Sequence, residues 1–298
     1  MTPVDIKDPS LSIIIPVTRM FGRLGNFKNM LKTAEPFKLQ IIVIHDKGDD
    51  ETGPEIQNIS KNFKNVEFIE GVYGSAGAAR NAGLSRVKSN WVSFWDSDDE
   101  PNVVECITLL EKIQIEKNLV GYGRFMKKSS GTDLPLTKSN LKFRNNAYEV
   151  VKNPGLWRWI FATNHIKSLK FSNLRLGEDI CFLFSVLQIT DGITIIERVI
   201  YKYVVGNPLQ TTQLLKNSAE IYLIVRYLNR NFYRDQKNRN LILGIFVNQL
   251  YSCLKRDKLK YKLVSLKIFT NSFFKMTLVE KVISIKWLLI IPLNFLDT

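Results

Sequence analysis

Histidine and cysteine are scarce in this chain, which contains two histidines and three cysteines among its 298 residues. Cys106, Cys181 and Cys253 lie far apart in sequence, and neither His45 nor His165 completes the spacing of a zinc site with them. We therefore expect neither a structural zinc ion nor a secreted scaffold built on disulfide bonds.

Long apolar runs are missing as well. The longest, residues 287–293, falls far short of the roughly 18 residues that a membrane-spanning helix needs. The opening segment MTPVDIKDPS has no apolar stretch behind a basic head, as a signal peptide would have. These absences favour a cytoplasmic protein or one bound peripherally at the cytoplasmic face of a membrane. The apolar fraction of 45% is nevertheless enough to fill a core, which excludes a disordered chain.

Acidic residues are in deficit, because 28 Asp and Glu stand against 42 Lys and Arg, and the formal net charge is +14. The excess is concentrated in one part of the chain, since residues 201–298 hold 16 basic and 5 acidic residues. A basic segment of this kind is typical of proteins that bind an anionic surface, either a nucleic acid or a membrane.

The first hundred residues alternate between short runs rich in β-branched residues and stretches with helical spacing. Strands are expected at residues 11–17, 39–44, 66–69 and 91–95, and helices at 27–31, at 55–63 and in GSAGAARNAG at 74–83. This order predicts an α/β fold with a mostly parallel central sheet that is covered on both faces. Farther along, we expect a helix at 103–117, a strand at 121–127, an apolar helix from residue 178, a strand at 193–205 and a C-terminal helical region with helices at 211–232, 240–254, 259–274 and 278–291.

An acidic cluster, FWDSDDE, directly follows the fourth of these strands at its carboxyl end. Parallel sheets bind ligands at this edge, and Asp96, Asp98 and Asp99 repel one another unless a cation shares their charge. Because Mg²⁺ commonly binds one or two carboxylates together with phosphate oxygens, the cluster indicates a site for a nucleoside diphosphate. The alternative is an Asp-rich turn that caps the helix after Pro101.

Two other residues are candidates for nucleotide binding. Asp46 ends the second strand, where its carboxylate can accept hydrogen bonds from a base or a ribose, although Asp and Gly also simply form loops there. Arg80 lies in a run of small residues that allows a ligand to approach closely, and its guanidinium suits a phosphate. The alternative for Arg80 is a surface position on a tightly packed helix.

In this order, SIIIPV, IIVIHD, GSAGAARNAGL and FWDSDD resemble the nucleotide-binding half of family 2 glycosyltransferases, whose motifs read approximately SIIIPVYN, IIVVDDGS, ARNxG and FLDSDD. The resemblance covers residues 10 to about 205. It implies a GT-A catalytic domain at 1–205, with a nucleotide-binding half at 10–100 and an acceptor half at 101–205, followed by a basic helical region at 206–298.

The resemblance also implies roles for individual residues. The nucleotide would contact Pro16, Thr18, Asp46, Arg80 and Asp96, with Asp46 against the base. Asp96 and Asp98 would form the DxD pair that binds Mn²⁺ or Mg²⁺, with Asp99 mainly a neighbour. The chain departs from the family at residues 18–19, where Thr-Arg replaces Tyr-Asn, and at 45–47, where His-Asp-Lys replaces Asp-Asp-Gly. A UDP-sugar donor is therefore expected on family grounds alone.

The acceptor half contains GEDICFLF, which resembles the family segment in which a Glu-Asp pair opens an apolar helix. The resemblance implies that Asp179 is the general base and Glu178 its companion. Attack at an anomeric carbon needs a deprotonated hydroxyl opposite the leaving diphosphate, and a single base implies inversion. The alternative is helix capping by acidic residues in the first turn. Trp157 and Trp159 are either an apolar platform for an acceptor sugar or core residues.

The last two expected helices combine lysines with apolar side chains. Their pattern suits interfacial helices on anionic lipid, with Trp287 on the last helix and a stripe on the one before it, formed by Leu259, Leu263, Leu266, Phe269 and Phe273. The alternative is a helical appendage that packs on the catalytic domain and has a solvated basic face. Because no nucleic-acid-binding motif is present, we expect a membrane partner and no nucleic acid.

Together these features predict an inverting, metal-dependent glycosyltransferase of bacterial polysaccharide or oligosaccharide synthesis. It would move a hexosyl or N-acetylhexosaminyl group from a nucleotide-sugar to a hydroxyl of a saccharide or lipid-linked acceptor. The polar loop at 129–140 would close over the donor. Two alternatives stay open, namely another nucleotide-sugar or nucleotidyl-transferring enzyme on a similar sheet, and a non-enzymatic basic protein that binds membrane or nucleic acid.

Overall fold

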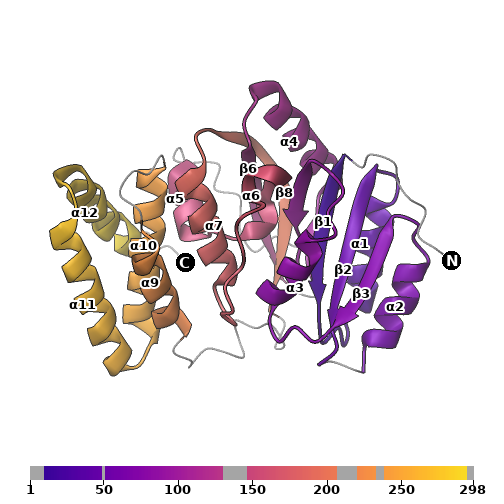
Figure 1. Ribbon diagram of the computed structural model, residues 1–298, viewed down its shortest axis with the longest axis horizontal. Coiled ribbons are helices and arrows are strands. Elements are labelled where there is room, and N and C mark those ends of the chain that lie inside the picture. The colour runs from indigo at the N-terminus through magenta and orange to yellow at the C-terminus, as the bar shows by residue number, and fades with distance from the viewer. Residues whose placement is uncertain (1–9, 49–50, 130–145, 207–219, 233–237, 294–298) are drawn as a thin grey trace. The chain divides into compact units, whose positions relative to one another are not determined.

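The computed structural model describes residues 10–48, 51–129, 146–206, 220–232 and 238–293. These residues form two compact units, of which the first holds the β-sheet and the second is helical (Figure 1). Most of the loop predicted at 129–140 and the first part of the helix predicted at 211–232 lie outside the described residues.

The first unit begins with the predicted alternation of strands and helices. It runs through β1 (Leu11–Val17), α1 (Leu24–Ala34), β2 (Leu39–Asp46), α2 (Gly53–Lys61), β3 (Val66–Gly71), α3 (Ala76–Leu84) and β4 (Trp91–Phe94). It continues through β5 (Glu100–Pro101), α4 (Val103–Glu116), β6 (Val120–Ser129), the 3₁₀ helix η1 (Leu156–Arg158), β7 (Trp159–Ala162), α6 (Thr163–Ile166) and β8 (Ile193–Val205). The four early strands and the three helices between them are thereby confirmed.

All eight strands form one sheet, in the order β3-β2-β1-β4-β7-β6-β8-β5. β1 pairs in parallel with β2 and β4, β2 with β3, and β6 with β8. β7 lies antiparallel between β4 and β6, and β5 is antiparallel to β8. Six strands therefore run in one direction, which confirms the mostly parallel α/β sheet. Because β1, β2 and β4 are parallel neighbours, their carboxyl ends meet at one edge of the sheet.

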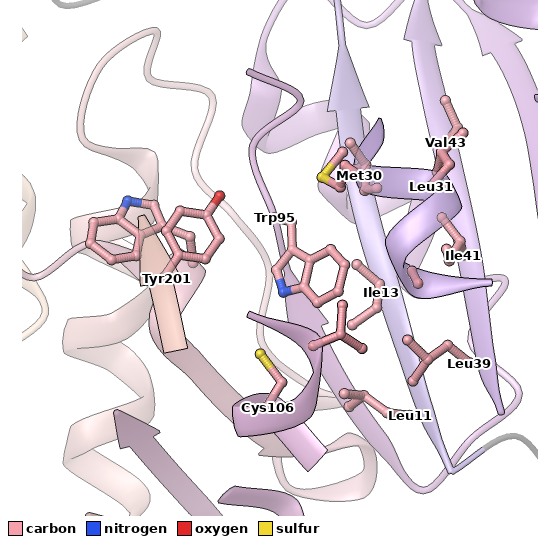
Figure 2. Packing of buried hydrophobic residues seen from close by; sticks show 14 of the residues in the cluster. Leu11, Ile13, Met30, Leu31, Leu39, Ile41, Val43, Trp95, Cys106 and Tyr201 are labelled. Carbon is pink, nitrogen blue, oxygen red and sulfur yellow. The ribbon is translucent and has the colours of Figure 1, made fainter. Parts of the chain in front are cut away.

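The central strands are buried on both faces, as their nearly continuous apolar runs predict. Ile13 joins a core cluster with residues of α1 and α4, while Ile14, on the opposite face of β1, packs against α3 at Gly83. Trp95, just after β4, lies in the first of these clusters between Ile13 and Tyr201 of β8 (Figure 2). The turn that follows β4 is thus anchored in the core.

The second unit contains only helices within the described ranges. These are α5 (Asn146–Lys152), α7 (Glu178–Ile189), α9 (Glu220–Arg230), α10 (Arg239–Arg256), α11 (Leu259–Lys275) and α12 (Leu278–Leu293). A capping box opens α12, since the N–H of Thr277 donates to Glu280 Oε2 at 2.8 Å and the N–H of Glu280 donates to Thr277 Oγ1 at 3.3 Å. In the chain as far as it is described, no helix is long and apolar enough to cross a bilayer. α5 and α7 belong to the same compact unit as the C-terminal helices. The boundary expected at residue 205 assigns these two helices to the catalytic domain instead. That boundary concerns function and stays a prediction.

Candidate functional site

The acidic turn after β4 lies at the carboxyl edge of the parallel strands and is held by β8. The backbone N–H of Asp96 donates to the hydroxyl of Tyr201 at 2.9 Å, and the N–H of Val204 donates to Asp99 Oδ1 at 2.7 Å. Asp99 is buried, whereas the side chains of Asp96 and Asp98 keep 31% and 17% of their surface exposed. The turn therefore uses one carboxylate as its anchor and presents the other two at the edge of the sheet.

Each of these two carboxylates is paired with an arginine. Arg80 of α3 donates from Nη2 to Asp96 Oδ1 at 2.8 Å, and Arg23 donates from Nη1 to Asp98 Oδ2 at 2.9 Å. The guanidinium of Arg80 also lies 5.6 Å from the centre of the Phe171 ring, which helps to fix it in place. The structure thus brings Arg80, Asp96 and Asp98 together, and it adds Arg23, which the sequence did not indicate.

Burial and mutual repulsion disfavour full ionisation of the acidic cluster. Burial raises the pKa of Asp98 and the charge of Asp96 raises it further, while the ion pair with Arg23 lowers it. The pKa of Asp99 is raised well above its ordinary value, first by burial and then by the charges of Asp96 and Asp98. Additional positive charge beside Asp96 and Asp98 would therefore stabilise the ionised cluster.

Asp96 and Asp98 have the chemistry to bind a hard divalent cation. Each arginine engages one oxygen of its carboxylate, and Mg²⁺ commonly takes one or two carboxylates when phosphate oxygens complete its coordination. The described residues contain no cluster of three or more His, Cys, Asp and Glu side chains that could hold a metal. Asp96 and Asp98 thus have the chemistry for a cation whose coordination phosphate oxygens complete.

The residues expected at the nucleoside lie at the same edge of the sheet. Asp46 ends β2, and its Oδ1 and Oδ2 accept hydrogen bonds from the backbone N–H groups of Tyr73 at 3.1 Å and Gly74 at 2.8 Å. Gly74 has a φ of +70°, which favours glycine at this turn. Pro16 lies at the end of β1, and Thr18 follows the strand and is exposed. Asp46 thus shapes the loop after β3, and its contact with a base stays a prediction.

Glu178 and Asp179 open α7 in the second unit. Gly177, directly before them, has a φ of +78°, and a Cβ at this position would collide with Ile224, so both conformation and space favour glycine. Glu178 is buried and Asp179 is half-buried, and Asp179 Oδ1 accepts a hydrogen bond from the N–H of Ile180 at 2.8 Å. This contact agrees with the capping alternative, and the role of Asp179 as a base stays a prediction.

Trp157 and Trp159 are buried in the first unit. The ring centre of Trp157 lies 4.6 Å from that of Tyr201 and 5.6 Å from that of Tyr203, with the rings nearly parallel. Trp159 is 0% exposed, and its ring centre lies 4.5 Å from that of Tyr122. This burial favours the core-packing alternative, and an acceptor role for either residue stays a prediction.

The segments that form this sheet edge, the acidic turn and the start of α7 match a sequence model of a known protein family. The model for glycosyl transferase family 2 matches residues 12–184, which include the acidic turn, both arginines and the Glu-Asp pair. The chain belongs to this family. This membership is what the sequence motifs predicted.

Individual glycosyltransferases match parts of the chain. It is 26% identical over 216 residues to glycosyltransferase GlyA of Streptococcus pneumoniae, a match that covers 66% of this chain and 31% of that protein. It is 24% identical over 221 residues to the uncharacterized glycosyltransferase EpsJ of Bacillus subtilis, covering 69% and 64%. It is 32% identical over 113 residues to the GalNAc(5)-diNAcBac-PP-undecaprenol beta-1,3-glucosyltransferase of Campylobacter jejuni, covering 35% and 34%. The matches span between 31% and 64% of the length of these relatives.

Solved structures share the fold. TarS 1–349 of S. aureus, in complex with UDP-GlcNAc, superposes with a TM-score of 0.65 at 16% identity, covering 93% of this chain and 79% of that chain. The mannosyltransferase PcManGT of Pyrobaculum calidifontis, in complex with GDP-Man and Mn²⁺, superposes with a TM-score of 0.56 at 9% identity, covering 95% and 85%. The likeness confirms the predicted GT-A-like architecture of this family 2 glycosyltransferase.

Proposed function

We propose that this glycosyltransferase is inverting and metal-dependent, and that it moves a hexosyl or N-acetylhexosaminyl group from a UDP-sugar to a hydroxyl of a saccharide or lipid-linked acceptor. The observation that carries the proposal is the pair of partly exposed carboxylates, Asp96 and Asp98, that lie beside Arg80 and Arg23 at the carboxyl edge of the sheet. Carboxylates and guanidinium groups together suit a diphosphate bridged by a divalent cation.

The relatives support the details of this reaction. The TarS complex with UDP-GlcNAc supports a UDP-sugar donor, and the mannosyltransferase complex with GDP-Man and Mn²⁺ supports a donor bound together with a metal. The Campylobacter jejuni relative, by its name, acts on an undecaprenol-linked acceptor, which supports a lipid-linked acceptor and a role in bacterial surface polysaccharide or oligosaccharide synthesis.

The donor side of the reaction is assigned to the first unit. Asp96 and Asp98 would hold Mn²⁺ or Mg²⁺, which when bound supplies positive charge to the leaving diphosphate. Arg80 would bind the diphosphate from the side of α3. The nucleoside would lie along Pro16, Thr18 and the loop that Asp46 shapes.

The acceptor side is assigned to α7. Asp179 would accept the proton of the acceptor hydroxyl, with Glu178 as its companion. A hydroxyl activated by one carboxylate attacks the anomeric carbon on the face opposite the leaving diphosphate, and the configuration at that carbon is therefore inverted. The released product would be a nucleoside diphosphate, whereas the nucleotidyl-transfer alternative would release pyrophosphate from a nucleoside triphosphate that reacts with a sugar 1-phosphate.

Asp98→Asn tests the metal site. We expect calorimetry to show that the wild-type protein binds UDP more tightly with Mn²⁺ than without it, and that D98N loses this gain because a neutral amide is a poor ligand for a hard cation. Asp191→Asn, an exposed position on the loop between α7 and β8, is the matched control and should keep the gain. A D98N protein that retains the full gain would remove Asp98 from the metal site.

Asp179→Asn tests the base. We expect UDP binding to be unchanged and turnover to fall by roughly 10²- to 10⁴-fold, because a positioned general base contributes about that factor. The measurement is release of UDP from UDP-GlcNAc with water as the acceptor, with D191N as the control. Release of pyrophosphate from UTP and GlcNAc 1-phosphate is assayed in parallel. Turnover retained by D179N would eliminate Asp179 as the base. Pyrophosphate from UTP and GlcNAc 1-phosphate, without UDP from UDP-GlcNAc, would favour nucleotidyl transfer.

We also propose that α11 and α12 hold the enzyme on an anionic membrane surface. Of the seventeen large apolar side chains that are exposed in the described ranges, eleven belong to these two helices, namely Leu259, Leu263, Val264, Leu266, Phe274, Leu278, Val279, Val282, Ile285, Leu288 and Leu289. Residues 258–293 carry seven lysines, and Glu280, their one acidic residue, is buried. Exposed apolar side chains among lysines suit anionic lipid, while the same charge would repel a second copy of the chain.

The apolar stripe expected on α11 is exposed only in part. Leu259, Leu263 and Leu266 are exposed, whereas Phe269 is buried and its ring centre lies 6.0 Å from that of Phe246. Phe273 is half-buried, and its ring centre lies 5.8 Å from that of Phe269. The proposed membrane surface therefore depends on the outward residues of both helices and not on the predicted stripe alone.

A further inference from the structure

The loop between β1 and α1 is tightly folded and ends at the acidic cluster. Arg19 and Gly22 have φ values of +53° and +68°, so the chain turns sharply twice within four residues. Met20, between them, is fully buried, and its N–H donates to Oγ1 of Thr52, directly before α2, at 3.3 Å. The loop is therefore anchored to the first unit, and it leads into Arg23 at the start of α1.

The guanidinium of Arg23 connects Asp98 with this loop. Nη1 donates to Asp98 Oδ2 at 2.9 Å, while Nη2 donates to the carbonyl oxygens of Thr18, at 3.3 Å, and of Arg19. The side chains of Arg23 and Asp98 are 13% and 17% exposed. The attraction between them is consequently screened less than that of a surface ion pair.

Arg23 occupies a carboxylate that the proposed cation also needs. A guanidinium and a divalent cation on one carboxylate repel each other, so binding of the metal favours departure of Arg23. A largely buried guanidinium that loses its anion is unfavourable unless another anion replaces it. A diphosphate supplies such an anion, because its oxygens match the fork of donors on arginine.

We propose that Arg23 is an internal counter-cation that occupies Asp98 and keeps metal ions from it. When a nucleoside diphosphate binds, the guanidinium of Arg23 would leave Asp98 and pair with the diphosphate. The proposal rests on the metal-dependent function proposed above and makes Arg23 a positioning residue for that site. Metal and nucleotide would then bind as one unit, each raising the affinity of the other by the same factor, as linkage requires. Thr18 and Arg19, whose carbonyl oxygens hold Arg23, would transmit the change to the nucleoside side of the site.

The test measures Mn²⁺ binding to the full chain, with and without UDP. The electron paramagnetic resonance signal of the free ion reports how much Mn²⁺ is bound. We expect wild-type protein to bind Mn²⁺ weakly alone and at least about tenfold more tightly with UDP. Arg23→Gln should bind Mn²⁺ alone about tenfold more tightly than wild type, the size expected when one charged hydrogen bond no longer competes, and should gain less from UDP. Arg23→Lys, which keeps the charge but not the fork of donors, should lie between them.

Arg86→Gln is the matched control, because it removes another arginine of the first unit, whose Nη2 pairs with Glu67 Oε1 at 2.6 Å. It should bind Mn²⁺ as the wild type does. Equal or weaker Mn²⁺ affinity of R23Q in the absence of UDP would overturn the proposal, and so would a wild-type Mn²⁺ affinity that UDP does not change. If neither the wild type nor any variant binds Mn²⁺, with or without UDP, the metal dependence of the proposed function fails too. If Mn²⁺ binding depends on UDP and R23Q leaves it unchanged, only the role of Arg23 is overturned.

Discussion

Asp96, Asp98 and Asp99 are neighbours in sequence, yet each has a different environment. Asp96 and Asp98 are partly exposed and paired with arginines, whereas Asp99 is buried and accepts a backbone hydrogen bond from Val204 of β8. A buried carboxylate is disfavoured in its ionised form, so the anchor of the turn carries an electrostatic cost that the other two partly avoid.

The buried carboxylate of Asp99 leads to a prediction about how the free energy of unfolding depends on pH. Burial and the neighbouring charges raise the pKa of Asp99 above its ordinary 3.8. Between the ordinary and the raised pKa, the folded chain binds a proton that the unfolded chain does not, so stability falls as pH rises through this window. Asp99→Asn keeps the oxygen that accepts the Val204 N–H and removes the charge. We expect the free energy of unfolding of D99N, relative to wild type, to rise with pH from about pH 4 upward. Urea unfolding in the presence of EDTA measures this difference, and a difference that is constant with pH would contradict it.

Local motifs identified the residues of the acidic cluster but not all of their partners. Asp96, Asp98 and Arg80 lie in short segments whose order along the chain is characteristic of the family. Arg23 is 75 residues from Asp98 in sequence, and nothing in its own segment indicates the contact. His45, which departs from the family pattern, is fully buried, with Nδ1 3.2 Å from Glu70 Oε2, so the departure fills the core and leaves Asp46 at the edge.

At the scale of elements, the site depends on how closely α3 approaches the sheet. Arg80 reaches Asp96 from α3, and this helix packs against β1 at Gly83, where a Cβ would lie 2.6 Å from Cγ2 of Ile14. Since Ile14 is fully buried in a central strand, it has little room to move. A larger residue at position 83 would therefore push the helix away from the strand.

Gly83→Ala should destabilise the protein by about 1–3 kcal/mol, the usual cost of overpacking a core, and should weaken UDP binding because Arg80 moves with α3. Gly25→Ala is the matched control. Gly25 also lies in a helix, α1, but its Cβ would meet no atom within 4 Å beyond its chain neighbours and the nearby backbone of its own helix. G25A should therefore stabilise by about 0.5–1 kcal/mol through helix propensity. Chemical unfolding and calorimetry with UDP measure both effects. A G83A protein as stable as wild type would show that the contact can relax.

The elements that the sequence predicts well are those buried on both faces. β1 and β2 are continuous apolar runs because both faces of the sheet are covered, and their parallel order follows from the helices between them. β7 has four residues and β5 has two, and both run against the main direction of the sheet. Segments this short carry no periodicity from which their direction or partners could be inferred.

At the scale of the whole chain, positive charge and exposed apolar side chains occur in the same region. The net charge of +14 comes mostly from residues 201–298, and within that range α11 and α12 carry the exposed apolar side chains described above. Composition alone left nucleic acid, membrane and a solvated basic face as alternatives, because charge does not distinguish them. The apolar side chains favour lipid, since a solvated face has no need of them.

The membrane surface is tested with vesicles of neutral lipid, with and without about a fifth of anionic phosphatidylglycerol. We expect wild-type protein to sediment with the anionic vesicles and to dissociate as KCl rises from about 50 to about 500 mM, because the Debye length then shrinks from roughly 14 to roughly 4 Å. Ile285→Glu with Leu289→Glu places two charges on exposed positions of α12 and should abolish binding at every salt concentration.

Ile115→Glu is the matched control, because Ile115 is equally apolar and 79% exposed but lies on α4 in the first unit. It should bind as the wild type does, which separates the surface of α11 and α12 from a general effect of added negative charge. If I285E/L289E sediments like I115E, the apolar face of α12 does not enter the lipid. If wild-type binding to anionic vesicles is the same at both salt concentrations, the lysines around that face contribute nothing, and the basic excess of residues 201–298 needs another explanation.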